Sequence, residues 1–228
     1  MNVSFNSEAI VPCAQHVGTV EILIPASASA DLFDDVPEST MHPAEAAAIA
    51  RAAAGRRREF ATVRYCARRA LRRLGIAPAP ILPDPDGVPR WPAGAVGSMT
   101  HCAGYRAAVV ARAEKLRGIG IDAEPHAALP GPAADLVLRD EERPRLRALA
   151  EADPGLHWDR VVFCAKEAVY KACFPVSRRW LEFSDISVTL HAGGTFDARV
   201  LAGGDGLAGR WTVDRGLVVA VTWVCHDD

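Results

Sequence analysis

The spacing of apolar positions predicts helices and strands that alternate along the chain. Apolar residues recur every three or four positions in two long segments, which predicts amphipathic helices at about 57–74 and 158–174. Shorter helical patterns lie at 43–55, 133–138 and 140–150. Short apolar runs predict strands at 17–24, 96–101, 105–112, 118–122, 186–191, 195–200, 209–214 and 217–224. Because strands and helices are interleaved in both halves, we expect the α+β fold class.

Two segments are expected to be loops, and one connection is expected to divide the chain. Residues 31–40 are acidic, and residues 78–92 contain six prolines and one glycine, which predicts a rigid loop. A boundary near 113–118 splits the chain into two similar lengths. We therefore expect an N-terminal half at 1–115 and a C-terminal half at 116–228.

The helix at 158–174 carries an unusual arrangement of charges. Lys166 lies in the middle of its apolar arc, where an unpaired ammonium is costly to bury. Glu167 and Lys171 are spaced i,i+4 and lie together at one edge of that arc. This arrangement suggests an anion-binding site, with a metal ion as one way to bind the anion. The alternative is an ordinary Glu–Lys pair on a solvated helix face.

Charge and composition limit the function classes. The 228 residues include 26 basic and 28 acidic side chains, for a net charge of −2, which gives no reason to expect nucleic-acid binding. No apolar run is long enough for a membrane span, and the first residues lack the basic start of a signal peptide. The six cysteines form no C-x-x-C motif, so we expect reduced thiols, a cytoplasmic protein and no zinc site.

The predicted strand at 118–122 ends in two carboxylates that point to one side. Asp122 and Glu124 are spaced i,i+2, so an extended backbone turns both side chains the same way. Each carboxylate raises the cost of ionising the other unless a cation lies between them. Mg²⁺ prefers oxygen ligands and commonly combines few carboxylates with substrate phosphates. A solvated strand end is the alternative.

Phosphate-binding groups occur in the first half. Ser98, Thr100 and His101 end the predicted strand at 96–101 and have donors for phosphate oxygens, although a histidine satisfied by backbone groups is equally compatible. Arginines crowd one helical segment, and arginine suits bidentate phosphate recognition, although part of this set is expected on a solvated face. These arginines are Arg51, Arg56, Arg57, Arg58, Arg64, Arg68, Arg69, Arg72 and Arg73.

Four segments, in order and spacing, resemble the 4′-phosphopantetheinyl transferases, most closely their long, monomeric, surfactin- and enterobactin-type branch. They are Gly87-Val-Pro-Arg-Trp-Pro, Gly97-Ser-Met-Thr-His-Cys-Ala-Gly, Gly118-Ile-Gly-Ile-Asp-Ala-Glu and Phe163-Cys-Ala-Lys-Glu-Ala-Val-Tyr-Lys. The resemblance implies two α+β halves related by a pseudo-twofold axis, with the active site in the cleft between them. It also implies that the arm of coenzyme A is transferred to a serine of an apo acyl or peptidyl carrier protein, with release of adenosine 3′,5′-bisphosphate.

The resemblance also implies residue roles. Asp122, Glu124 and Glu167 would hold Mg²⁺, or Mn²⁺, against the pyrophosphate of coenzyme A, with Glu167 as general base and Lys171 on the pyrophosphate. The remaining implied coenzyme A contacts belong to both halves and are Arg56, Arg64, Arg90, Thr100, His101 and Lys166.

Three positions depart from the family pattern. Ala123 stands where some relatives have a polar residue, which leaves one ligand fewer. Phe163 replaces a common tryptophan. Val88 stands where some relatives have lysine, and Arg90 would then supply that phosphate contact.

Two other functions use the same residues. One is a metal-dependent phosphohydrolase acting on nucleotides, with water as the nucleophile. The other is a non-catalytic module that binds carrier proteins or nucleotides. The sequence does not distinguish carriers of fatty-acid, polyketide and nonribosomal-peptide synthesis.

Overall fold

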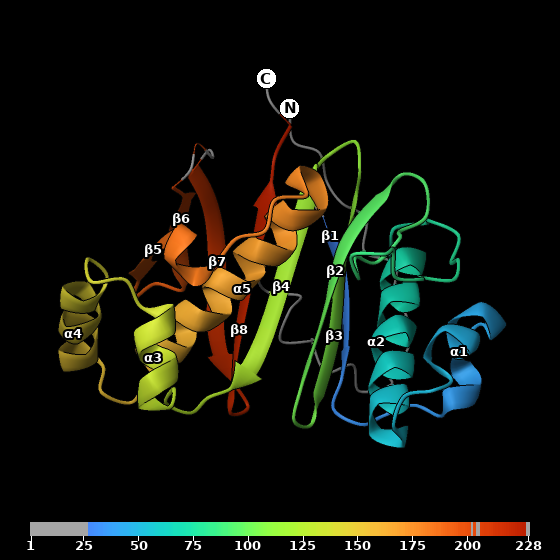
Figure 1. Ribbon diagram of the computed structural model, residues 1–228, viewed down its shortest axis with the longest axis horizontal. Helices are drawn as coiled ribbons and strands as arrows, with labels where there is room; N and C mark the ends of the chain where they lie inside the picture. Colours follow the sequence, from blue (N-terminus) through green and yellow to red (C-terminus); the bar gives the residue numbers. More distant parts are fainter. Residues whose placement is uncertain (1–26, 202, 204–205, 227–228) are drawn as a thin grey trace, which may run out of the picture.

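The protein has two antiparallel sheets, each beside a long helix, in a computed structural model that describes residues 27–201, 203 and 206–226 (Figure 1). The first sheet has the strand order β1-β3-β2, and the second has the order β4-β8-β7-β6-β5. This arrangement confirms the α+β class. No helix among the described residues is long and apolar enough to cross a bilayer.

The N-terminal half consists of a three-stranded sheet and two helices. Its strands are β1 (Ser27–Leu32), β2 (Ala95–Cys102) and β3 (Tyr105–Arg112), and its helices are α1 (Pro43–Ile49) and α2 (Ala54–Arg73). The apolar face of α2 packs on β1 and β3 to form the core of this half, as its periodicity predicts. α1 ends six residues before the expected limit, and α2 begins three residues earlier than expected.

The C-terminal half has a larger sheet and three helices. Its strands are β4 (Gly118–Pro125), β5 (Ile186–His191), β6 (Thr195–Val200), β7 (Gly206–Asp214) and β8 (Leu217–Val224). α3 (Gly131–Val137) and α4 (Arg143–Ala152) precede α5 (Trp158–Ser177), which packs across β4 and β8. All the elements expected after residue 116 are present; β5, β6 and β8 have the expected bounds, and the other elements have shifted ends.

One strand forms where no strand was predicted. β1 pairs with β3, so that Ala28 and Ala30 turn their small side chains toward α2 and are buried. Its sequence is Ser-Ala-Ser-Ala-Asp-Leu, which lacks the β-branched residues that indicate strands. The predicted acidic loop therefore begins after Leu32 and contains a short 3-10 helix, Glu38–Thr40. The strand expected at 17–24 lies outside the described residues.

Two glycines let α5 approach β4 closely. A Cβ atom at Gly120 would clash with the backbone carbonyl oxygen of Ala168, and one at Gly118 would clash with that of Ala172. Because neither glycine has a side chain, the backbones of helix and strand pack directly against each other. This contact places the polar end of β4 beside the middle of α5.

The two halves meet where β2 and β4 lie side by side (Figure 1). Side-chain hydroxyls on β2 accept hydrogen bonds from the backbone of β4. The Ser98 Oγ accepts from the N–H of Ile121 at 3.2 Å, and the Thr100 Oγ1 accepts from the N–H of Ala123 at 3.1 Å. These bonds satisfy backbone donors that would otherwise be buried without a partner. We refer to this contact as the hydroxyl seam.

Candidate active site

A cleft of about 670 Å³ lies between the two halves. Its lining comes from α2, the loop at 83–89, β2, the end of β4 and one face of α5. Basic and acidic side chains both line it. The basic ones are Arg56, Arg64 and Lys171, and the acidic ones include Asp122, Glu124 and Glu167. The structure therefore brings together groups that are far apart in the sequence.

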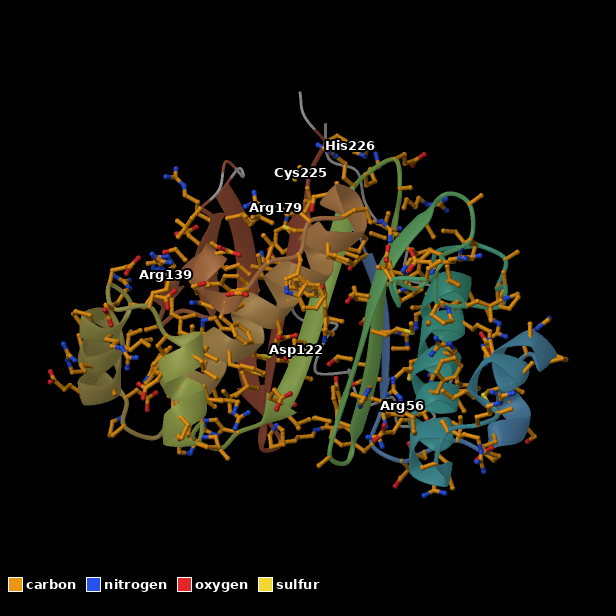
Figure 2. The ribbon with its side chains drawn as sticks, viewed as in Figure 1. Arg56, Asp122, Arg139, Arg179, Cys225 and His226 are labelled. Atoms are coloured by element: carbon orange, nitrogen blue, oxygen red, sulfur yellow. The ribbon has the colours of Figure 1, made fainter. Side chains whose placement is uncertain are left out.

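Asp122, on β4, is the most buried carboxylate of the cleft (Figure 2). Its Oδ1 accepts hydrogen bonds from the Lys171 Nζ at 2.6 Å and from the Thr100 Oγ1 at 3.1 Å. Its Oδ2 is buried and has no hydrogen-bond partner among the described residues. A buried carboxylate oxygen without a donor is costly, so this atom is suited to a cation.

Glu124 and Glu167 both have raised pKa values. Burial is the main cause in each case, and the negative charge of Asp122 adds to it. Glu124 is paired with Arg160, whose Nη1 lies 3.2 Å from its Oε2, and this cation partly offsets the rise. Three carboxylates thus influence one another at one end of β4 and on the facing turn of α5.

Lys171 is the cation nearest to these carboxylates. Burial alone would lower the pKa of its ammonium, but the charge and hydrogen bond of Asp122 and the charge of Glu167 together raise it. Lys171 therefore keeps its charge at neutral pH. It lies on the same face of α5 as Glu167, one turn further along the helix.

The carboxylates do not form a complete metal cage. Among the described residues, no three His, Cys, Asp or Glu side chains are grouped closely enough to hold a metal ion. Mg²⁺ commonly takes one or two carboxylates and completes its shell with water and substrate phosphates. The oxygen-only donor set and the unpartnered Oδ2 of Asp122 fit an ion of this kind.

Thr100 and His101 have different surroundings although they are adjacent. The hydroxyl of Thr100 is buried in the hydroxyl seam, whereas the side chain of His101 is 37% exposed and accepts a hydrogen bond at its Nε2 from the Arg56 Nη1 at 2.6 Å. A guanidinium has only donors, so the ring must be neutral at that nitrogen. Burial, which is the main cause, lowers the pKa of His101 and favours the same state. Arg56 lies at the first turn of α2 (Figure 2).

Arg64 is a buried cation in the wall of the cleft. Its guanidinium lies 3.1 Å from the centre of the Phe60 ring, and its Nε donates to the carbonyl of Ile81 at 2.7 Å. Burial lowers the pKa of Arg64 to about 10, so the side chain is still charged at neutral pH. A fixed, desolvated guanidinium is well suited to bind an anion.

Comparison with known proteins identifies the family. A family model described as the 4′-phosphopantetheinyl transferase N-terminal domain matches residues 44–111, and one described as the 4′-phosphopantetheinyl transferase superfamily matches residues 118–222. The chain belongs to the 4′-phosphopantetheinyl transferase superfamily.

Three relatives support this assignment. The 4′-phosphopantetheinyl transferase PptT of Mycobacterium tuberculosis is 48% identical over 222 residues, which cover 89% of this chain and 97% of the relative. The transferase Svp of Streptomyces mobaraensis is 48% identical over 194 residues, covering 81% and 79%. The transferase Npt of Nocardia iowensis is 42% identical over 218 residues, covering 88% and 97%.

For this member of the family, the structure corrects the prediction for Lys166. The side chain is fully buried and points away from the cleft. Its Nζ donates to the carboxylate of Glu142 at 2.9 Å and to the backbone carbonyls of Val137 at 2.8 Å and Phe183 at 3.2 Å. An ammonium enclosed in this way cannot reach coenzyme A. Lys166 instead joins α5 to the end of α3, to the start of α4 and to the short 3-10 helix at Phe183–Asp185.

Arg90 is exposed and does not belong to the lining of the cleft. Its backbone N–H donates to the carbonyl of Leu82 at 2.8 Å and helps to close the turn of the loop. The contact between Arg90 and coenzyme A stays a prediction.

Sequence reasoning did not assign three residues that belong to the site. Tyr170 and Phe174 line the cleft from α5, with their rings stacked at 5.2 Å between centroids. They lie on the face of α5 that carries Glu167 and Lys171, so their helical spacing could have placed them beside these residues. Arg160 pairs with Glu124 across 36 residues, and nothing in the sequence marks that contact.

Proposed function

We propose that the protein transfers the 4′-phosphopantetheine arm of coenzyme A to a serine of an apo acyl or peptidyl carrier protein, with Mg²⁺ and with release of adenosine 3′,5′-bisphosphate. Membership of the transferase family supports the reaction class. The observation that carries the metal-assisted form is the buried, unpartnered Oδ2 of Asp122 beside Glu124 and Glu167.

Asp122, Glu124 and Glu167 do not form a cage by themselves, so they would hold the ion together with water and the substrate phosphates; Mn²⁺ is an alternative with the same oxygen preference. When bound, such an ion neutralises charge that develops on the pyrophosphate oxygens. The pKa values of Glu124 and Glu167 are raised mainly by burial and then by the charge of Asp122, so Lys171 and Arg160 do not fully offset the cost of ionising these two carboxylates. An added cation would remove that cost.

Glu167 is the proposed general base. In the reaction the serine oxygen forms a bond to the β-phosphorus of coenzyme A, and the bond between that phosphorus and the bridging oxygen breaks. The proton of the serine hydroxyl has to leave as its oxygen attacks. Without the ion, the raised pKa of Glu167 favours proton acceptance. Coordination to the ion would lower the basicity of this carboxylate, so a water molecule beside Glu167 would relay the proton.

The cations of the cleft would bind the phosphates. Lys171 lies beside the carboxylates and would donate to the pyrophosphate. Arg56 and Arg64 line the opposite wall, together with Thr100 and His101, and would face the 3′-phosphate end of coenzyme A. Fixed charges of this kind need little rearrangement when the substrate binds.

Further features of the protein are proposed with this function. One chain supplies every group named above, so we propose a monomer whose partners are coenzyme A and the carrier, without nucleic acid or membrane. The described cysteines are free thiols, which supports a cytoplasmic location. We also propose that the halves 1–115 and 116–228 are its two domains, because the described sheets separate in the connection between β3 and β4.

The deciding experiment incubates the protein with coenzyme A, Mg²⁺ and a panel of apo carrier proteins, followed by mass spectrometry. We expect each accepted carrier to gain the mass of one phosphopantetheine, and the panel would show which carriers are modified. Cleavage of coenzyme A without a mass gain would instead support a phosphohydrolase. Binding of coenzyme A that is indifferent to Mg²⁺, with no reaction, would support a non-catalytic module.

A further inference from the structure

One wall of the cleft is a tight turn of the proline-rich loop, which we call the cleft hairpin (residues 82–90). The backbone N–H of Asp84 donates to the carbonyl of Val88 at 2.8 Å, and the N–H of Gly87 donates to the carbonyl of Asp84 at 3.0 Å. The Asp84 Oδ1 also accepts from the backbone of Asp86 at 3.0 Å and of Val88 at 2.9 Å. Asp84 therefore organises the turn and has its second carboxylate oxygen left for another partner.

That partner belongs to the other half of the molecule. The Nη1 of Arg178 lies 2.6 Å from the Asp84 Oδ2 and 3.2 Å from the Asp86 Oδ2. Arg178 is the C-cap of α5, the helix that carries Glu167 and Lys171, and is 94 residues from Asp84 in the sequence. One guanidinium thus joins the cleft hairpin to the end of the helix on the facing wall.

The backbone at Arg178 gives an independent indication that this side chain has a role. Its φ is 55°, in the left-handed region where helices usually end in glycine. A bulky residue in that region is uncommon, and such outliers gather at functional sites. Glycine would fit the helix end better, whereas arginine supplies the contact with Asp84 and Asp86.

Charge gives the contact a consequence for ligand binding. Asp86 lines the cleft, and its carboxylate would repel an anionic ligand there. The side chain of Asp84 is only 11% exposed, and the turn already fixes its orientation, so Asp84 itself loses little entropy when the 49% exposed side chain of Arg178 binds it. The hydrogen bond from Arg178 is the main cause that lowers the pKa of Asp84, so the pair stays charged through the neutral range.

We propose that Arg178 is a positioning residue for coenzyme A: it holds the cleft hairpin against the end of α5 and offsets part of the negative charge of two aspartates that would repel the phosphates. The choice of coenzyme A as the ligand rests on the proposed function. Arg178 acts through the hairpin and does not itself belong to the reacting groups.

The test compares Arg178→Gln with wild type in steady-state transfer. We expect KM for coenzyme A to rise about threefold to fivefold, as for a well-ordered ion pair, with kcat and KM for the carrier unchanged. Hydrogen exchange at the backbone of residues 84–88 should quicken in the unliganded variant. Arg178→Gly should show the same KM rise with no loss of melting temperature, because glycine suits the left-handed backbone.

Two further proteins complete the design. The double variant Asp84→Asn with Asp86→Asn removes both charges, while the side-chain oxygen at position 84 can still accept the hydrogen bonds of the turn. Adding Arg178→Gln to this double variant should therefore raise KM for coenzyme A little further. Arg143→Gln is the matched control, since Arg143 also pairs with two aspartates, Asp135 at 3.1 Å and Asp140 at 3.5 Å, within one half. It should leave KM for coenzyme A and hairpin exchange unchanged.

The proposal is overturned if Arg178→Gln leaves KM for coenzyme A unchanged, whether or not hairpin exchange changes, or if Arg143→Gln raises KM equally. Failure of the proposed function would look different, since wild type itself would then modify no carrier. In that case the dissociation constant of coenzyme A from calorimetry replaces KM. An unchanged constant in Arg178→Gln overturns the proposal, and a raised one supports it.

Discussion

Lys166 and Lys171 lie on one helix and have opposite electrostatic surroundings. Lys166 is enclosed in the C-terminal half, and burial, its largest influence, lowers its pKa in spite of Glu142. Lys171 faces the cleft, where Asp122 and Glu167 raise its pKa. Between them, Glu167 projects toward the cleft. The Lys-Glu pair that marks this sequence thus combines a residue for stability with a residue for the proposed chemistry.

Replacing Lys166 by Met should destabilise the fold without weakening the binding of coenzyme A. The substitution leaves the buried carboxylate of Glu142 without its cation, a change that costs about 3–5 kcal/mol. Urea unfolding measures the loss, and calorimetry measures binding below the transition. Adding Glu142→Gln should recover part of the stability. A variant of normal stability that binds coenzyme A weakly would contradict the structural role.

Burial of Lys166 was predictable from sequence, but its partners were not. The helical wheel places it in the apolar arc, as observed. Its carboxylate partner, however, lies at the start of α4, and its carbonyl partners lie at the end of α3 and after α5. Only the packing of three segments decides whether a long side chain turns toward a cleft or into a core. The sequence pattern contains no information on that direction.

Replacing Glu167 by Gln should increase stability while reducing activity. The pKa of Glu167 is raised in the folded state, so the protonated side chain favours the fold. This contribution to stability is complete below about pH 4.5, the pKa of glutamate in the unfolded chain. It is lost as the pH rises through the higher pKa of the folded state. At pH 7.5 without metal, the melting temperature of Glu167→Gln should therefore exceed that of wild type by about 2 °C or more. The difference should shrink near pH 4.

The same variant tests the proposed base. Transfer by Glu167→Gln should fall by about 100-fold, as expected when a general base is removed. Glu151→Gln, an exposed position on α4, is the control and should retain full activity. Activity within about tenfold of wild type, roughly one pKa unit of free energy, would exclude both the base role and the ligand role of Glu167.

Among the elements, β4 has the central position. It pairs with β8 on one edge, meets β2 at the hydroxyl seam on the other and supports α5. The sequence predicted β4 and α5 as separate elements with carboxylates on each. Their contact depends on Gly118 and Gly120, and a glycine in a strand pattern does not reveal which element approaches it.

Replacing Gly120 by Ala should displace α5 from β4. The added Cβ would meet the Ala168 carbonyl oxygen, which is backbone and cannot move aside alone. We expect a loss of about 3 kcal/mol from overpacking and a fall in transfer, since Lys171 and Asp122 would separate. Gly131→Ala is the control, because a Cβ there meets nothing within 4 Å. Unaltered unfolding of Gly120→Ala would show that the close contact is not required.

At the scale of the whole molecule, the two halves are joined both by a buried apolar cluster, formed by β3 with β4 and β8, and by polar contacts. The hydroxyl seam joins their sheets, and Arg178 joins the cleft hairpin to α5. Local sequence patterns predicted the described helices and strands of each half, apart from β1. They could not predict contacts such as Arg178 with Asp84, because a contact between side chains 94 residues apart depends on how the two halves are placed relative to each other.

Replacing Thr100 by Val tests the hydroxyl seam. Valine has nearly the same shape but leaves the buried N–H of Ala123 without an acceptor, which costs about 1–3 kcal/mol. It also removes a donor to the Asp122 carboxylate. Thr100→Ser keeps the hydroxyl and should resemble wild type in urea unfolding and transfer. Equal stability of the valine and serine variants would show that the Thr100 hydroxyl contributes nothing to the stability of the seam.

The direct contact between α5 and β4 has a consequence for how such a chain can diverge. No layer of side chains separates these backbones at Gly118 and Gly120, so the depth of the helix is not set by the size of core residues. Substitutions elsewhere in the core can then change the melting temperature while Lys171 stays beside Asp122. We therefore expect turnover to vary less than stability when core residues of such a chain are substituted.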